Sequence, residues 1–310
     1  MRKLISVMTP CFNEVDNVGP LHEAVAAAFK ELPGYDWEHI FIDNASTDGT
    51  AAVLRKMAAA DPQVKVILNT RNFGQIRSPY YGVLQAFGDA VVPLAADFQD
   101  PPALVPALVA KWEEGFEVVQ AVKTSARESG LMFAVRKLYY RLVTDLSDVR
   151  LVKNTTGFGL YDRQVVDILR TMNEAYPYFR GLTAELGFEP AVVEYAQPAR
   201  ASGSTSNNFF SLYDVAMAAI TSHSRVPLRI AAMLGFVSAL ASMVIAFVYL
   251  IYKLVNWQTF SVGIAPVVIG LFFFGSVQLL FLGVVGEYIG AIYTQVLNRP
   301  LVVEKERINF

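Results

Sequence analysis

Short apolar runs alternate with amphipathic stretches between Leu4 and Val122. The runs have the length of buried strands, and the stretches between them carry apolar residues at helical spacing. Strands are predicted at 4–8, 39–42, 64–68, 90–94 and 117–122, and helices at 17–32, 50–60, 75–87 and 101–114. Repeated strand–helix pairs predict an α/β domain with a mostly parallel sheet covered on both faces.

Two long uncharged segments follow near the C-terminus. Ile230–Tyr252 contains 23 residues and Phe260–Gly286 contains 27, and neither carries a charge. A membrane span needs roughly 20 apolar residues, so both segments are long enough to cross a bilayer. A pair of buried core helices is the alternative interpretation, although helices of soluble proteins rarely lack charge over such a length.

The connector between these spans, 253–259, is short, so the two spans form a hairpin whose ends face one side. Five basic residues flank that side, namely Arg225, Arg229, Arg299, Lys305 and Arg307, whereas the connector holds only Lys253. The positive-inside bias then predicts that residues 1–228 and the C-terminal tail are cytoplasmic. The apolar run at 4–8 is too short for a signal peptide. The expected location is the inner (plasma) membrane, as a multi-pass protein.

Four parts of the chain are predicted from this pattern: a cytosolic domain at 1–206, an amphipathic juxtamembrane helix at 207–228, a transmembrane hairpin at 229–290 and a cytosolic tail at 291–310. An apolar stripe runs along 209–220. It is typical of a helix that lies in the membrane interface, but a helix that packs on the core fits the pattern equally well.

Polar clusters follow four of the predicted strands. They are 9–14 (TPCFNE), 43–48 (DNASTD), 69–75 (NTRNFGQ) and 95–100 (AADFQD). Parallel α/β sheets bind ligands at the carboxyl ends of their strands, so we expect the four clusters to meet at one edge of the sheet.

Composition excludes several classes of protein. Hydrophobic residues make up 54% of the chain and charged residues 17%, which argues against a disordered chain. The net charge is -2 and the pI about 6.0, so the basic footprint of a nucleic-acid-binding protein is missing. A single cysteine, Cys11, forms neither an intramolecular disulfide nor a cysteine zinc cluster. The three histidines, His22, His39 and His223, are far apart and show no metal-binding spacing.

The acidic and amide side chains at the strand ends suggest cation chemistry. The chain has no Gly-x-Gly-x-x-Gly motif and no P-loop, so a phosphate ligand would need a divalent cation beside these carboxylates. Mg²⁺ or Mn²⁺ suits one or two carboxylates completed by substrate phosphates. Asp97 and Gln99 are two apart, so on an extended chain both oxygens would reach one ion.

Each acidic residue also has a structural interpretation. Asp48 and Asp100 stand where they would cap the helices that begin near 50 and 101. Asp43 suits hydrogen bonds from a base or ribose, but Asp43 and Glu14 would also be ordinary loop acids. Downstream of the fifth strand, basic residues alternate with aromatic ones. They form either a solvated charged face or a cationic shelf for an anionic lipid headgroup. The basic residues are Lys123, Arg127, Arg136, Lys137 and Arg141.

These elements resemble family 2 glycosyltransferases of the GT-A fold, and most closely the branch that loads sugars onto polyisoprenyl phosphates, such as dolichol-phosphate mannose synthases, bactoprenol glucosyltransferases and undecaprenyl-phosphate aminoarabinose transferases. The motifs are 10–14 (PCFNE), 43–48 (DNASTD), 71–74 (RNFG), 96–102 (ADFQDPP), 156–163 (TGFGLYDR), 178–182 (YFRGL), 227–229 (PLR), 286–290 (GEYIG) and 298–300 (NRP). The resemblance implies a GT-A nucleotide-sugar-binding domain with a Rossmann-like, mostly parallel sheet, an interface helix and a two-helix membrane hairpin.

Site residues are carried over from the resemblance position by position. It implies nucleotide binding by Pro10, Phe12, Asn13, Glu14, Asp43, Asn44, Asn72 and Asp97. It implies a metal ion, Mg²⁺ or Mn²⁺, on Asp97 and Gln99. It implies that Lys123, Arg127, Arg136 and Arg200 receive phosphate charge from the lipid or the donor. The expected catalytic residues are Asp97, Asp100, Arg127 and Arg136.

The chain departs from the family pattern at several positions. Ala95 replaces the first aspartate of the Asp-x-Asp metal motif, and Asn44 replaces the second aspartate of a common pair. Ser206 stands where relatives often have a lysine. The element 197–201 (QPARA) lacks the tryptophan of the Gln-x-x-Arg-Trp signature of processive polysaccharide synthases.

The resemblance implies transfer of a monosaccharide from a nucleoside diphosphate sugar, with uridine the expected base, to undecaprenyl phosphate. A phosphate monoester carries about -1.5 to -2 charge at pH 7, so it is already a nucleophile and direct displacement with inversion is expected. The alternatives are a family 2 transferase with a glycan acceptor and a non-catalytic membrane scaffold of the same fold. Small residues in the spans (Gly235, Ala239, Gly270, Gly275) also allow a homo-oligomer.

Overall fold

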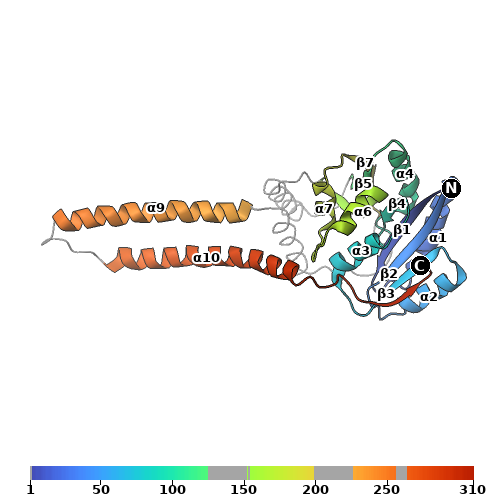
Figure 1. The fold of residues 1–310 in the computed structure, drawn as a ribbon, viewed down its shortest axis with the longest axis horizontal. Helices are drawn as coiled ribbons and strands as arrows, with labels where there is room; N and C mark the ends of the chain where they lie inside the picture. Colours follow the sequence, from blue (N-terminus) through green and yellow to red (C-terminus); the bar gives the residue numbers. More distant parts are fainter. Residues whose placement is uncertain (1, 125–151, 153, 199–225, 256–263) are drawn as a thin grey trace.

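The computed structural model describes residues 2–124, 152, 154–198, 226–255 and 264–310. An eight-stranded mixed sheet with helices on both faces unites strands from the first two hundred residues with one strand from the end of the chain (Figure 1). The strands are β1 (Lys3–Cys11), β2 (Tyr35–Asp43), β3 (Val64–Asn69), β4 (Ala90–Pro93), β5 (Val118–Lys123), β6 (Thr155–Asp162), β7 (Pro190–Tyr195) and β8 (Glu304–Ile308). The helices are α1 (Val18–Phe29), α2 (Thr50–Ala60), α3 (Gly74–Leu84), α4 (Val105–Glu113), α6 (Arg163–Thr171), α7 (Phe179–Glu185), α9 (Val226–Val255) and α10 (Ile264–Val296).

The strand order is β7-β5-β6-β4-β1-β2-β3-β8. Strands β4, β1, β2 and β3 are neighbours and run parallel, and β5 is parallel to β7. Only β6 and β8 pair antiparallel with their neighbours among the described strands. The mostly parallel α/β sheet predicted from the sequence is confirmed, and the four polar clusters leave it at one edge.

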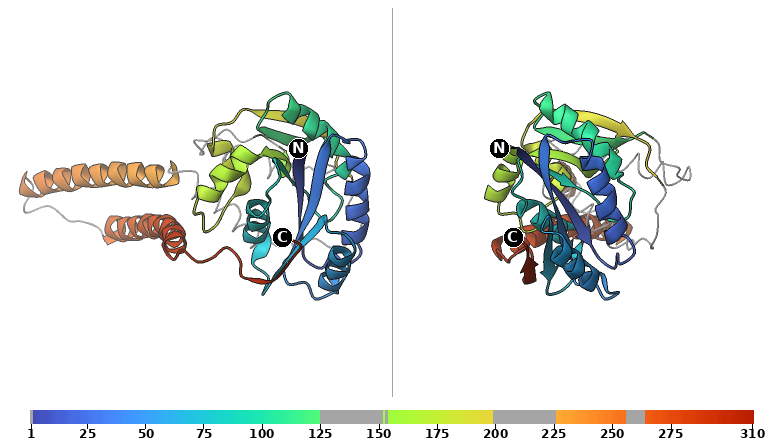
Figure 2. Two further views of the ribbon diagram at one scale, coloured as in Figure 1. Left: turned by 45° about the vertical axis from the view of Figure 1, so that its right-hand side comes forward. Right: turned by 90° about the vertical axis from the view of Figure 1, so that its right-hand side faces the viewer.

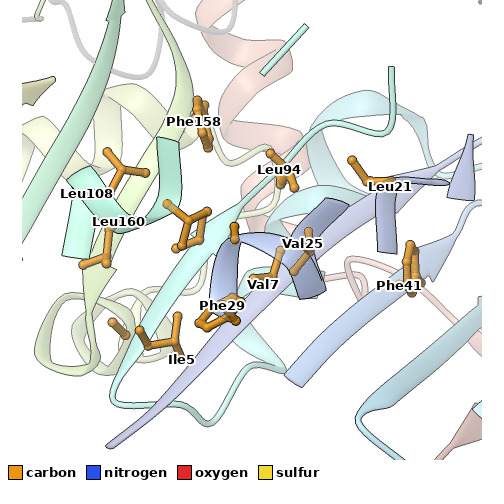
Figure 3. Packing of buried hydrophobic residues seen from close by; sticks show 14 of the residues in the cluster. Ile5, Val7, Leu21, Val25, Phe29, Phe41, Leu94, Leu108, Phe158 and Leu160 are labelled. Atoms are coloured by element: carbon orange, nitrogen blue, oxygen red, sulfur yellow. The ribbon is translucent and has the colours of Figure 1, made fainter. Parts of the chain in front are cut away.

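Apolar side chains bury both faces of the sheet. Helices α1, α2 and α4 cover one face, where Val25 and Phe29 of α1 lie near Ile5 and Val7 of β1 (Figure 3). Helices α3 and α6 cover the other face through residues such as Tyr80 and Val165. Because both faces are covered, the central strands are nearly continuous apolar runs, as the sequence shows.

Element boundaries follow the predictions closely where apolar periodicity was strong. Helix α2 spans Thr50–Ala60 as predicted, and β1 and β2 extend the predicted strands at both ends. The predicted helix at 101–114 instead starts with a 3-10 turn, Pro102–Leu104, before α4. Pro106 explains this division, because it has no N–H to donate to the carbonyl oxygen of Pro102, as an α-helix continuous from 102 would require.

Helices α9 and α10 extend away from the sheet as an antiparallel pair (Figures 1 and 2). Val226–Ile245 and Phe273–Val296 are long and apolar enough to cross a membrane, and no part of either segment is buried against the protein. The alternative of two buried core helices is therefore wrong. Helix α10 continues to Val296, ten residues beyond the predicted end of the second span at Gly286.

The end of the chain is a strand, where the sequence predicted only a tail. Strand β8 pairs antiparallel with β3, and Asn309 Nδ2 donates to the carbonyl oxygens of Ala58 and Val64 at 2.7 and 2.9 Å. Lys305 and Arg307 therefore lie in a sheet edge, not beside the hairpin. Because the start of α9 and the end of α10 both connect to the sheet domain, the hairpin's two ends face the same side (Figure 1).

Two histidines that are far apart in the sequence lie together beneath the sheet edge. His22 Nδ1 is 3.2 Å from His39 Nδ1, and His39 Nε2 is 3.0 Å from Thr9 Oγ1. Burial and the neighbouring His22 lower the pKa of His39. Nothing in the spacing of these histidines along the chain predicted that the two rings meet. No group of three or more potential metal-binding side chains occurs among the described residues.

Candidate functional site

Hydrogen bonds join the loops that follow β1 and β2. Ser46 Oγ accepts from the backbone N–H of Asn13 at 2.8 Å and donates to Asp43. In return, Asn13 Oδ1 accepts from the backbone N–H of Thr47 at 2.8 Å. Asn13 adopts a left-handed backbone with φ 58°, which asparagine tolerates better than most residues. The first two clusters therefore form one surface.

Asn44 joins the third cluster to the second. Its Oδ1 accepts from the backbone N–H of Phe73 at 2.9 Å and from Asn69 Nδ2 at 3.2 Å. Its Nδ2 donates to Asn72 Oδ1 at 2.8 Å and to the carbonyl oxygen of Gly74 at 3.3 Å. We call the residues Asn13, Asp43, Asn44, Asn69 and Asn72 the amide edge. Asn44 is buried, so these bonds fix the turn after β3.

Asp43 is the acid of the amide edge. Its side chain is 2% exposed, and Ser46 donates to its oxygens through both the backbone N–H and the hydroxyl. Burial raises the pKa of Asp43 above its ordinary value, while the bonds from Ser46 act in the opposite direction. The carboxylate of Asp43 is therefore buried and held in one orientation by Ser46.

Three other residues of the predicted nucleotide site lie at or beside the amide edge. Glu14 accepts from Asn17 Nδ2 at 2.6 Å, and Phe12 is 42% exposed. Pro10 lines a cavity described below. Asp48 is not the N-cap residue of α2, which is Gly49, but its Oδ1 accepts from the backbone N–H of Thr50, the first residue of that helix, at 3.0 Å.

The fourth cluster, after β4, contains two buried acids, Asp97 and Asp100, which we call the acid corner; they are 8% and 6% exposed. The chain at 97–99 is a turn, since Phe98 has φ 59° and the Gln99 backbone N–H donates to Asp97 Oδ1 at 3.2 Å. The extended chain assumed between Asp97 and Gln99 is therefore wrong. That Asp97 and Gln99 bind one ion together stays a prediction, but the turn means that their side chains would reach it from a backbone that is not extended.

Asp100 is held by residues of strands β6 and β7. Its Oδ1 accepts from Tyr195 Oη at 2.7 Å and from Thr156 Oγ1 at 3.4 Å. The helix-cap interpretation of Asp100 is wrong, because the residue before the 3-10 turn is Pro101 and no side chain caps it. Burial raises the pKa of Asp100, and Asp97 raises it further, whereas Tyr195 and the nearby charge of Lys123 lower it.

A cavity of about 440 Å³ opens beside the acid corner. Its walls include Pro10 of the first cluster, Gln75 of the third, and Ala95 and Asp100 of the fourth. Residues 156–158 and 177–180 complete the opposite wall. The predicted convergence of the strand ends is thus confirmed, although Asp97 and the amide edge lie next to this cavity and do not line it.

Several predicted phosphate contacts fall outside the described residues. These are Arg127, Arg136 and Arg200, together with the basic residues Lys137 and Arg141. Residues 207–225 of the predicted interface helix at 207–228 also lie outside the described residues, whereas 226–228 form the start of α9. Lys123, at the end of β5, is described, and its charge acts on Asp100. It is therefore the predicted basic residue that the structure brings to the acid corner.

Sequence reasoning assigned no role to Tyr195, Thr156 or Arg180. Thr156 and Arg180 belong to motifs quoted for the family resemblance, 156–163 and 178–182, which was the available signal. Arg180 Nη1 donates to the carbonyl oxygen of Thr155 at 2.6 Å, and its guanidinium lies 5.2 Å from the centre of the Tyr178 ring. Tyr195 lies on β7, which pattern analysis did not predict.

The residues of the acid corner fit a hard divalent cation. Two nearly buried carboxylates lie close enough for their charges to interact, which is unfavourable without a counter-charge. Carboxylate oxygens are the preferred ligands of Mg²⁺, which usually completes its coordination with water and substrate phosphates.

Comparisons with known proteins show the family and the fold of the chain. Residues 6–169 match the family described as "Glycosyl transferase family 2". The SfII prophage-derived bactoprenol glucosyl transferase of Shigella flexneri is 33% identical over 307 residues, covering 97% of both chains. A solved structure of a mycobacterial protein has a TM-score of 0.50 at 20% identity, covering 71% of this chain and 73% of that one, and shares the fold. The glucosyl-3-phosphoglycerate synthase of Mycobacterium tuberculosis, solved with Mn²⁺ and UDP, has a TM-score of 0.47 at 22% identity, covering 71% of this chain and 78% of that one.

Proposed function

The chain belongs to glycosyl transferase family 2 and is a glycosyltransferase, and we propose that it moves a monosaccharide from a nucleoside diphosphate sugar to a polyprenyl phosphate at the cytoplasmic face of a membrane. One observation carries the proposal. The similarity to a bactoprenol glucosyl transferase runs over 97% of the chain, so it includes the apolar hairpin as well as the domain with the site.

In this proposal the amide edge binds the nucleoside. The Asp43 carboxylate is buried and fixed by Ser46, so it is oriented before a base or ribose hydroxyl donates to it. Asn13 and Asn72 are held in place by the neighbouring loops. Phe12 is exposed beside them and presents an aromatic face on which a base can stack.

The acid corner would hold a divalent cation, Mg²⁺ or Mn²⁺, through Asp97, with Gln99 as the other predicted side chain. When bound, such a cation neutralises charge on the diphosphate leaving group. Asp100 would lie beside this cation, where Tyr195 donates a hydrogen bond to its carboxylate and the charge of Lys123 lowers its pKa. Because Ala95 stands at the first position of the usual metal motif, the protein supplies few carboxylates there and relies on substrate oxygens.

The cavity beside the acid corner suits the acceptor phosphate and the transferred sugar. Asp100, Arg180 and the Tyr178 ring lie in its walls, and Lys123 adds positive charge nearby. A phosphate monoester is already ionised at pH 7, so no residue has to remove a proton from it. The chain's task is to hold the phosphate in line with the anomeric carbon for displacement with inversion. Arg127, Arg136 and Arg200 are proposed to share this contact.

The hairpin supports a reaction at a membrane. Helices α9 and α10 present apolar side chains over their lengths, and both connect to the sheet domain at the same end. With the positive-inside bias, the domain and β8 would lie in the cytoplasm, with the protein crossing the inner membrane twice. A lipid acceptor then diffuses in the same bilayer that holds the enzyme.

Transfer of a radiolabelled sugar tests the proposal. Purified full-length protein in lipid nanodiscs is given labelled UDP-glucose, Mn²⁺ and undecaprenyl phosphate, then extracted with organic solvent. We expect label in the organic phase as a glycolipid, because the product keeps the polyprenyl tail. Label that moves only to a water-soluble glycan would favour the glycan-acceptor alternative and refute the lipid proposal. Asp97→Asn serves as the matched inactive variant.

A further inference from the structure

The last turn of α10 and the segment that follows it contact the domain at two separate places, and each place adjoins a different side of the candidate site. The first contact reaches the segment that leads into the cavity wall at 177–180. The second reaches the turn that carries Asn72. Only a short stretch of chain, 295–303, separates the two contacts.

Polar side chains make the first contact. Gln295 Oε1, in the last turn of α10, accepts from the backbone N–H of Ala175 at 3.0 Å. Its Nε2 donates to the carbonyl oxygen of Asn173. Asn298 Oδ1 accepts from Asn173 Nδ2 at 2.7 Å. The side chains therefore hold both the backbone and a side chain of a segment that ends at Pro177, the first cavity residue of 177–180.

The chain then turns sharply toward the sheet. Asn298 has φ 46°, the left-handed conformation that often ends a helix, and Pro300 prevents the helix from continuing. Leu301 packs against the apolar cluster that contains Tyr80 and Leu182, and Val302 is 6% exposed. The path from α10 to β8 is thus fixed by packing as well as by hydrogen bonds.

Backbone groups make the second contact. The carbonyl oxygen of Val303 accepts from Thr70 N–H at 3.0 Å and from Thr70 Oγ1 at 3.1 Å. Thr70 lies between Asn69 and Asn72, the two residues of the amide edge that bond to Asn44. The segment that follows the membrane helix is therefore bonded, seven residues beyond Val296, to the turn on the donor side of the site.

We propose that Gln295 and Asn298 are positioning residues, which hold the 173–180 wall of the cavity against the fixed donor side so that an acceptor enters in the correct alignment. The inference rests on the proposed function for the identity of the acceptor. Neither residue lines the cavity, so both act through the segment they hold. The position of the hairpin in the bilayer would thereby determine the position of this cavity wall.

Two variants of Asn298 separate positioning from helix capping. Asn298→Gly keeps the left-handed backbone but loses the acceptor oxygen for Asn173, whereas Asn298→Asp keeps both. For Asn298→Gly we expect KM for undecaprenyl phosphate to rise about fivefold, the equivalent of one lost hydrogen bond, with KM for the donor sugar nearly unchanged. Asn298→Asp should restore the wild-type KM. Equal KM values for all three proteins would overturn the proposal.

A matched control lies on the same segment of chain. Glu306 of β8 forms an ion pair with Arg55 of α2 at 2.7 Å, which Glu306→Gln breaks. The substitution changes neither of the two contacts described above. We expect its KM for the acceptor to match wild type. A rise as large as that of Asn298→Gly would show that any disturbance of the tail has the same effect, and it would refute a specific positioning role.

Hydrogen exchange tests the same inference without any substrate. In nanodiscs, Gln295→Met removes the acceptor for Ala175 N–H while keeping the length of the side chain, so we expect faster exchange across 173–180 and unchanged exchange in β1. Unchanged exchange at 173–180 would overturn the positioning role. If wild-type protein transfers no sugar to a lipid phosphate, the proposed function is refuted. The exchange experiment still tests whether Gln295 holds the 173–180 segment, because it needs no substrate.

Discussion

The amide edge and the acid corner lie side by side at the ends of parallel strands, yet they are built in opposite ways. Asn44 of the amide edge has hydrogen bonds for both its side-chain oxygen and its side-chain nitrogen. The amide edge holds one buried acid, Asp43, which accepts two hydrogen bonds from Ser46. The acid corner instead brings two buried carboxylates close together, so Asp97 adds to the burial that raises the pKa of Asp100. The hydrogen bonds of the amide edge stabilise the fold. The acid corner instead holds two carboxylates whose repulsion is unfavourable until a cation binds between them.

This contrast predicts that the two regions respond differently to mutation. Removing a carboxylate from the acid corner should abolish activity without loss of stability. Removing a hydrogen-bonding side chain from the amide edge should cost stability first. The expected effects below run from the largest to the smallest.

The largest effect is expected for Asp97→Asn. Loss of this carboxylate should lower kcat by about 100-fold or more, because charge on the leaving group would no longer be neutralised. The melting temperature should stay level or rise, since one of two repelling buried charges is gone. Transfer assays and thermal unfolding on the same preparation check both effects. A large drop in melting temperature would break the contrast with the amide edge.

Removal of divalent metal tests the acid corner without mutation. With excess EDTA we expect transfer to fall to the level of Asp97→Asn, and added Mn²⁺ or Mg²⁺ should restore it. The matched readout is thermal stability in the presence of nucleotide sugar, which should rise only when metal is also present. Full turnover in EDTA would refute the assigned role of Asp97.

Asn44→Ala should have the opposite profile. The substitution leaves Asn69, Asn72 and Phe73 without their shared partner, so we expect the free energy of unfolding to fall by about 2–3 kcal/mol. Chemical denaturation measures this change. Asn44→Asp keeps both acceptor contacts and should lose less. A loss of activity with unchanged stability would contradict the proposed contrast, because Asn44 would then behave like the residues of the acid corner.

A smaller effect is expected for Tyr195→Phe, which removes the hydroxyl that bonds to Asp100. That bond lowers the pKa of Asp100, so its loss should raise the pKa further and move the acidic limb of the pH–rate profile to higher pH. The native state would then take up this proton before the unfolded chain does. The variant should therefore gain more stability than wild type as the pH falls toward 3.8, the ordinary value. If the acidic limb does not move, protonation of Asp100 does not limit the rate at low pH.

The smallest effect concerns the histidine pair below the amide edge. Burial lowers the pKa of His39 below its ordinary value of 6.5, so below that pH the unfolded chain binds the proton first. We expect stability to fall as the pH decreases below 6.5, and His39→Gln should flatten that decline. Thermal unfolding between pH 5 and 8 provides the measurement. A decline of equal slope in the variant would contradict this origin.

Much of the fold was predictable because its signals are local. The apolar runs of β1 to β5 and the periodic face of α2 are read directly from neighbouring residues, and parallel strands force their polar ends together. Asp97 and Asn44 were found for that reason. Strand β8 was missed because its charged residues Lys305 and Arg307 are typical of a solvated tail, and only pairing with β3 makes it a strand.

Long-range contacts account for the remaining differences. Tyr195 holds Asp100 across 95 positions of sequence, and His22 meets His39 only because α1 packs on β2. The turn at Phe98 depends on a left-handed backbone that phenylalanine rarely adopts, so an extended chain was the natural expectation there. Such contacts depend on tertiary packing, which no local pattern records.

A comparison of two acceptors tests the central claim most directly. Full-length protein in nanodiscs is given labelled UDP-glucose and Mn²⁺ with either undecaprenyl phosphate or undecaprenol, lipids that differ only in the phosphate group. The account predicts rapid formation of an organic-soluble glycolipid from the phosphate and almost none from the alcohol, because the phosphate is an ionised nucleophile and the cavity is proposed to hold it. Equal transfer to both lipids, or transfer to neither while a soluble glycan is labelled, would contradict it.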